Sequence, residues 1–148
     1  MSREILYRGK RTDNGEWVEG WVTSQFKKHT EGELLTRIQS NVFGIGEHLV
    51  DTETVGEYTG LTDKNGKKIF EGDIVKCRDL YNDIEFTAVV EFGNPNGTYS
   101  WGWQLYPISG NTYVNLDILL WIETEETGVL AEVIGNFHDN PELLEVSE

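Results

Sequence analysis

The chain has 148 residues, and its 26 acidic side chains outnumber its 12 basic ones, which gives a formal net charge of −14 at pH 7. A hydrophobic share of 38%, with five Trp residues, is enough for a folded core and excludes a disordered chain. No apolar run approaches the ~20 residues that a membrane-spanning helix needs. No apolar signal segment follows Met1. We therefore expect a cytoplasmic protein with one domain, or one domain and a small satellite.

Three Asn-Gly pairs, at 14–15, 65–66 and 96–97, mark the expected turns between strands. Asn-Gly is the strongest short hairpin signal, because a type I′ turn needs positive φ at both central residues. The strands predicted before and after the three turns are, in chain order, 5–7 and 17–22, 57–59 and 69–77, and 86–92 and 99–105. The pattern predicts a mainly β, antiparallel protein.

Helix signals are weak, because sixteen glycines interrupt the chain and few windows keep a helical period. The segment 117–122 fits either a helix capped by Asp117 or a strand, and its continuous apolar run favours the strand. A closing strand is expected over 129–137. After it, Asn140 can cap a short helix in which Pro141 and Glu142 suit the first turn.

The residue pattern changes near residue 50, from short strands mixed with a polar stretch to hairpins and a closing strand. This change predicts that the chain has two parts. Residues 1–50 form an N-terminal region that contains a β-hairpin, and residues 51–148 form a small barrel with a short C-terminal helix. The acidic turn at Glu71 and Gly72, followed by apolar residues, is typical of the entry to a strand of an SH3-like or OB-like barrel.

The residues that often carry chemistry give no catalytic or metal pattern. His29, His48 and His138 have no partner at metal-ligand spacing, so we expect no zinc. The single cysteine, Cys77, has no histidine nearby in sequence to activate it, and we interpret it as a small buried hydrophobe. We therefore expect no enzyme activity, no metal and no cofactor.

Seven aromatic residues form either part of the core or a surface on which bases stack, and the core is favoured because few basic residues accompany them. They are Trp17, Trp21, Tyr99, Trp101, Trp103, Tyr106 and Tyr113. The best basic clusters lie at 8–11 and 64–68, at or beside predicted turns. Against a charge of −14 we expect no direct binding to nucleic acid.

Two motifs resemble the YopX family of phage and prophage proteins: a central motif at 54–75 and a closing motif at 132–144. The resemblance implies a phage-derived protein of a bacterial host, an SH3-like barrel in the C-terminal part, and homo-oligomers. It supplies no catalytic residues, and we interpret the motif residues as structural. They are Tyr58, Thr59, Gly60, Leu61, Asp63, Asn65, Gly66, Glu71, Gly72, Asp73, Ile74, Val75, Ile134, Gly135, Asn136, Asn140, Pro141 and Glu142.

The leading functional hypothesis is a non-enzymatic phage or prophage accessory protein in the bacterial cytoplasm. It would act through contacts with copies of itself and with a host or phage protein. One alternative is a small-molecule or nucleotide enzyme that uses carboxylates. Another is an acidic DNA mimic, whose carboxylates would occupy the DNA-binding groove of a host enzyme.

Overall fold

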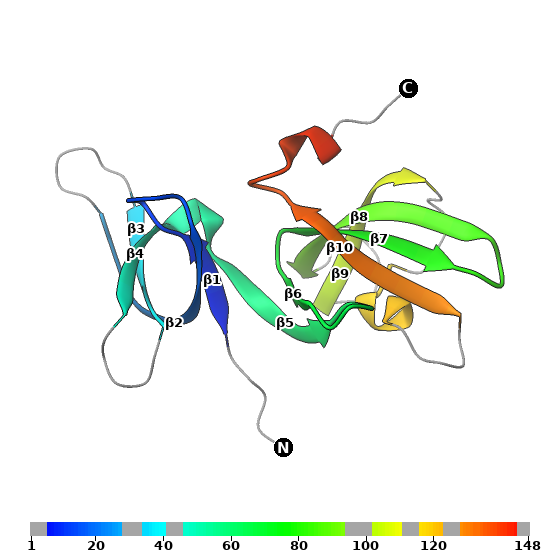
Figure 1. The fold of residues 1–148 in the computed structure, drawn as a ribbon, viewed down its shortest axis with the longest axis horizontal. Coiled ribbons are helices and arrows are strands. Elements are labelled where there is room, and N and C mark those ends of the chain that lie inside the picture. Colours follow the sequence, from blue (N-terminus) through cyan, green and yellow to red (C-terminus); the bar gives the residue numbers. More distant parts are fainter. Residues whose placement is uncertain are drawn as a thin grey trace, which may run out of the picture. The chain divides into compact units, whose positions relative to one another are not determined.

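The computed structural model describes residues 6–27, 34–40, 46–93, 102–110, 116–122 and 128–144. These residues form ten β-strands and three short 3-10 helices (Figure 1). The prediction of a mainly β fold is confirmed. The chain divides into two compact units, Met1–Tyr58 and Thr59–Glu148. No helix in the described part of the chain is long and apolar enough to cross a membrane.

The first unit is an antiparallel meander in the order β4-β3-β2-β1. Its strands are β1 (Tyr7–Lys10), β2 (Trp17–Lys27), β3 (Leu34–Gln39) and β4 (Glu47–Asp51), followed by the helix η1 (Thr52–Thr54). The free side of β1 pairs with the start of β5 (Gly56–Thr62), which continues into the second unit. Leu35, Ile38 and Val50 are buried in the first unit.

The first two Asn-Gly turns lie where they were predicted, but they are not of type I′. Only the glycine of each pair has positive φ, 71° at Gly15 and 78° at Gly66. In the first turn the Asn14 Oδ1 accepts a hydrogen bond from the Glu16 N–H at 3.0 Å, which is the Asx-turn geometry of a longer loop. The pair at 96–97 lies outside the described residues.

The second unit contains a four-stranded antiparallel sheet in the order β10-β7-β8-β9. The elements of this unit after β5 are β6 (Lys68–Phe70), β7 (Asp73–Asp79), β8 (Ile84–Gly93), β9 (Gly102–Gly110), η2 (Ile118–Trp121), β10 (Val129–Asn136) and η3 (Pro141–Leu144). Strands β8 and β9 pair as the third hairpin predicted. The described strands form open sheets and do not close a barrel.

The strand predicted over 69–77 is broken in two by a tight turn. Gly72 has a φ of 88°, and the Asp73 Oδ2 accepts a hydrogen bond from the Phe70 N–H at 2.8 Å. As a result β6 stays beside β5, whereas β7 joins the other sheet. The acidic turn at Glu71 and Gly72 was expected at the entry to a strand, but no local pattern shows that the strands before and after it belong to different sheets.

The core of the second unit lies against one face of the four-stranded sheet. Its fully buried members include Cys77, Phe86 and Leu105. Phe86 meets Trp121 edge to face, with ring centroids 4.8 Å apart. This arrangement agrees with the geometry that aromatic pairs prefer.

Within the segment 117–122 the residues Ile118–Trp121 form the 3-10 helix η2, so the strand predicted there is wrong. The Asp117 Oδ1 accepts a hydrogen bond from the Leu119 N–H at 3.0 Å and caps the helix. Residues three apart lie on one side of a 3-10 helix. Ile118 and Trp121 are therefore buried together, while Leu119 and Leu120 are exposed.

Strand β9 stands at one end of its sheet and carries Pro107. On its outer side the Leu105 N–H donates to the Leu116 carbonyl oxygen at 2.8 Å. Gln104 forms an isolated bridge with Asp117. The segment before η2 thus covers part of this edge.

Two glycines of the first unit provide a test of the described packing. A methyl group at Gly20 would overlap the backbone carbonyl of Gln39 on the neighbouring strand, whereas one at Gly15 would meet nothing but would be strained by positive φ. We expect Gly20→Ala to lower the free energy of unfolding by about 3 kcal/mol, and Gly15→Ala by about 1 kcal/mol. Urea denaturation of both variants gives the comparison, and equal losses would contradict the strand pairing.

Candidate functional site

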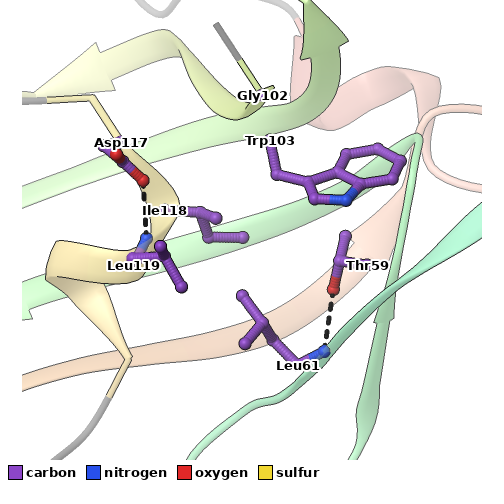
Figure 2. A pocket seen from close by; sticks show the side chains of 7 residues that line it. All are labelled: Thr59, Leu61, Gly102, Trp103, Asp117, Ile118 and Leu119. Carbon is purple, nitrogen blue, oxygen red and sulfur yellow. Dashed lines mark hydrogen bonds between the residues drawn. The ribbon is translucent and has the colours of Figure 1, made fainter. Parts of the chain in front are cut away.

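A pocket of about 260 Å³ lies in the second unit (Figure 2). Strand β5, the start of β9 and the helix η2 form its walls. The described residues that line it are Thr59, Leu61, Gly102, Trp103, Asp117, Ile118 and Leu119. Three segments that are distant in sequence therefore meet at one hollow.

The pocket is mainly apolar and has an exposed apolar rim. Ile118 is buried and belongs to the core, and Leu61 packs against that core. At the rim, Leu119 is 65% exposed. Trp103 also packs against the core, and its ring meets Phe92 at a centroid distance of 5.0 Å. Phe92 itself is 61% exposed, so the core face of β8 and β9 continues outward to the surface.

Three polar groups lie among these apolar walls. The Thr59 hydroxyl donates to the Ile69 carbonyl oxygen at 2.8 Å and accepts from the Leu61 N–H at 3.2 Å. The Asp117 carboxylate holds η2 as its cap. The indole N–H of Trp103 makes no hydrogen bond to any described residue, and Figure 2 shows it on the ring edge turned toward Thr59. Within the part of the chain that the structure describes, this N–H therefore has no acceptor at the pocket.

The first residues of the central motif lie along β5. Thr59 and Leu61 line the pocket. Tyr58 is buried, and Gly60 has a φ of 85° with open space around it. Of all the motif residues, only Thr59 and Leu61 are among the described residues that line the pocket.

Asp63 holds the turn that follows β5. It is 7% exposed. Its Oδ1 accepts hydrogen bonds from the N–H groups of Asn65 at 2.8 Å and Lys67 at 2.9 Å. Its Oδ2 accepts from the Val133 N–H of β10 at 2.9 Å. One carboxylate thus closes the turn that contains Gly66 and fastens it to a strand seventy residues later.

The rest of the central motif builds the turn into β7. Glu71 and Gly72 form this turn, and Asp73, Ile74 and Val75 are buried after it. The Gly72 N–H donates to the Val90 carbonyl at 2.9 Å, and the Gly72 carbonyl accepts from the Phe137 N–H at 2.8 Å.

The closing motif forms a compact turn after β10. Asn136 Oδ1 accepts from the backbone N–H groups of His138 at 3.0 Å and Asp139 at 2.9 Å. Asn140 Oδ1 accepts from the Asn136 N–H at 3.1 Å. A Cβ at Gly135 would lie 2.5 Å from that same Asn140 oxygen, so a larger residue there would displace the Asn140 side chain.

The short helix η3 begins at Pro141, as predicted, but the predicted capping role of the Asn140 side chain is wrong. Its oxygen bonds back to Asn136, and its Nδ2 donates to the Glu142 Oε1 at 3.3 Å. Ile134 precedes this turn and is exposed.

The fold brings the two motifs together. Strands β7 and β10 pair along their length, and Asp63 and Gly72 bond to the closing motif. No sequence pattern indicated a binding site at Asp117, Ile118 and Leu119. Their only signal was a capping residue before an apolar run, which is also typical of a core element.

The aromatic residues are divided between core and surface. Trp103 is half-buried, and Trp17 lies beneath the Arg8 guanidinium, 4.6 Å from the ring centroid. The prediction of a core position is wrong for Trp21 and Tyr106, which are exposed. The remaining three, Tyr99, Trp101 and Tyr113, lie outside the described residues.

Cys77 lies fully buried in the core, and burial raises the pKa of its thiol to about 12. A thiol with this pKa is protonated at neutral pH and is a poor nucleophile. His48 lies near the Ser40 hydroxyl at 3.3 Å, and His138 packs against Phe137. His29 lies outside the described residues. Among the described residues no group of three or more His, Cys, Asp or Glu side chains could hold a metal ion.

A family model described as YopX protein matches residues 6–145. The chain belongs to the YopX family. The match confirms the resemblance seen in the two motifs, and the contacts above give these YopX motifs a common role in holding β5, β7 and β10.

Among solved structures, the chain is similar to the crystal structure of protein EF1440 from Enterococcus faecalis. The two are 24% identical, the match covers 97% of this YopX chain and 100% of the other, and the TM-score is 0.48. The comparison with curated proteins found no match.

Replacing Asp63 tests its place in the fold. In Asp63→Asn an amide group would oppose at least one of the three backbone N–H groups that the carboxylate now accepts. We expect the free energy of unfolding to fall by about 3 kcal/mol, because a buried N–H loses a charged partner. Asp13→Asn, which removes a carboxylate whose side chain is 62% exposed, is the control and should change stability little. Equal effects in chemical denaturation would contradict the role of Asp63.

The buried thiol predicts both reactivity and a dependence on pH. Native protein should resist thiol reagents, and unfolded protein should react. The folded-state pKa of about 12 lies above the ordinary thiol pKa of 9.0, so Cys77 contributes stability below pH 9 that is lost as pH rises toward 12. The stability difference between wild type and Cys77→Ala should therefore shrink above pH 9. Rapid labelling of the native protein would contradict this.

Proposed function

We propose that this YopX-family chain is a non-enzymatic phage or prophage accessory protein. It acts through protein–protein contacts, as a homo-oligomer and with a host or phage partner. The observation that supports this most is the exposure of large apolar side chains in the second unit, which include Leu80 at 66% and Tyr81 at 75%. Exposed apolar side chains that gather on a surface are typical of interfaces.

The turn between β7 and β8 offers the self-contact surface. Leu80 and Tyr81 are neighbours there, and the Tyr81 ring lies so close to Gly128 that a Cβ at that glycine would overlap it. The Leu80 N–H donates to the Gly128 carbonyl at 3.0 Å. These contacts hold the backbone of the turn and the Tyr81 ring in place before any partner arrives, which lowers the entropy lost on association.

The non-enzymatic part of the proposal rests on how the motif carboxylates are used. Asp63 and Asp73 are buried and accept backbone hydrogen bonds, so their oxygens maintain the fold. A carboxylate that serves as a catalytic acid or base must reach the substrate proton. The structural use of these residues favours a binding protein over an enzyme that works through its motif carboxylates.

The acidic DNA mimic is the second candidate, and the net charge of −14 favours it. A mimic needs carboxylates spaced like phosphates on one exposed surface. Inhibition of a host DNA-binding protein by the purified chain, relieved by added duplex, would favour this candidate over the first.

Light scattering tests the homo-oligomer. We expect a mass that is a multiple of 16.9 kDa at micromolar concentration. Added salt should strengthen the association, because it screens the repulsion between subunits that each carry −14. The double variant Leu80→Ser and Tyr81→Ser should shift the mass toward the monomer.

The matched control is Leu119→Ser, because Leu119 at 65% and Leu80 at 66% are equally exposed. This variant should keep the wild-type mass. A mass of 16.9 kDa at every protein and salt concentration would contradict the homo-oligomer.

A further inference from the structure

We infer that the pocket between β5, β9 and η2 receives one large apolar side chain from a basic polypeptide segment of a partner protein. The inference rests on the proposed function, because it names the kind of partner that the second unit would bind. It assigns a second contact surface, separate from the Leu80 and Tyr81 turn.

The size and walls of the pocket fit a side chain. Its volume of about 260 Å³ lies just under the range of about 300–1,000 Å³ that is usual for sites of cofactors and drug-sized ligands. Leu61, Trp103 and Ile118 provide apolar walls that join the core, so an inserted side chain would continue the packing of the core. The occupant is therefore one large aliphatic or aromatic side chain.

The rim has the features of an interface centre. Leu119, which lines the pocket, and Phe92, whose ring contacts the lining residue Trp103, are both more than half exposed. Aromatic anchors around a desolvated pocket contribute most of the binding energy in many interfaces. The exposed side chains of the rim would be covered when the anchor enters.

The free donor at the pocket points to a peptide backbone. The indole N–H of Trp103 bonds to no described residue, and a purely apolar occupant would leave it without an acceptor. A backbone carbonyl next to the inserted side chain supplies that acceptor. A hydrocarbon chain of a lipid cannot supply it.

Charge selects a basic segment. Asp117 is the one charged side chain among the described residues that line the pocket, and the whole chain carries −14. Asp or Glu beside the anchor would be repelled by Asp117, whereas Lys or Arg there is attracted. An apolar residue flanked by basic residues therefore matches both the apolar walls of the pocket and the negative charge of Asp117.

Short peptides provide the probe. Acetyl-Arg-Phe-Arg-amide is titrated into the labelled full chain while the five indole N–H signals are followed by NMR. The Trp103 signal is identified by its loss in Trp103→Phe. We expect this signal to shift with the probe, and to shift far less with acetyl-Arg-Ala-Arg-amide or acetyl-Glu-Phe-Glu-amide. No shift with the first peptide, or equal shifts with all three, overturns the proposal.

Two variants of residues that line the pocket test whether the peptide binds there. Leu119→Ser should weaken the first peptide about tenfold, because it removes an apolar rim contact. Asp117→Asn keeps a residue that can cap η2 and removes the charge, so the peptide should bind about twofold to fivefold more weakly. The matched control is Asp79→Asn, since Asp79 also accepts backbone hydrogen bonds, from Tyr81 and Asn82, but lies outside the pocket. Unchanged binding in both pocket variants overturns the proposal.

The same samples separate this proposal from the homo-oligomer. Leu80→Ser with Tyr81→Ser should lower the mass of the assembly and leave peptide binding unchanged. Leu119→Ser should weaken peptide binding and leave the mass unchanged. If Leu119→Ser lowers the mass instead, a second copy occupies the pocket and the basic partner segment is wrong. If the protein is monomeric and still binds the first peptide, the homo-oligomer is wrong and the proposal that the pocket binds a basic segment stands.

Discussion

The carboxylate of Asp63 is the constraint on which the second unit depends. It accepts hydrogen bonds from two N–H groups of its own turn and from one N–H of β10. Because the group is nearly buried, leaving any of these donors unpaired costs more than an average surface contact contributes. Strand β10 then pairs with β7, whose first residue follows the Gly72 turn. The central and closing motifs of the family therefore act together: their contacts with each other fix the positions of β5, β7 and β10.

The sequence predicted the parts of the fold that local chemistry decides. The Asn-Gly turns at 14–15 and 65–66 were located correctly because asparagine and glycine suit turn geometry whatever surrounds them. Strands β2, β8 and β10 were located because their aromatic and β-branched residues fit a sheet. The acidic turn at Glu71 and Gly72 was also recognised, but the change of sheet after it depends on distant partners such as the Val90 carbonyl, and no local pattern contains that information.

The candidate site was only partly visible in the sequence, for a related reason. Thr59 and Leu61 stood in the central motif, but Trp103 had the same alternating pattern as a core residue. Its neighbour Phe92 lies on the same face of β8 as the buried core residues, but it is exposed. Tertiary packing decides at which residue this face of the strand becomes exposed. Asp117 was recognised as a possible cap, yet the apolar run after it favoured a strand until the 3-10 helix placed Ile118 and Trp121 on one side.

Pro107 has a consequence for how copies of this chain can aggregate. Backbone N–H groups two residues apart on a strand face the same side. Since the Leu105 N–H points outward to Leu116, the missing N–H of Pro107 lies on the outer side as well. A strand from another molecule added along β9 would find one donor occupied and the next one missing. This edge therefore opposes amyloid-like stacking and strand exchange, and it allows a strongly β protein to display apolar side chains without polymerising through that strand.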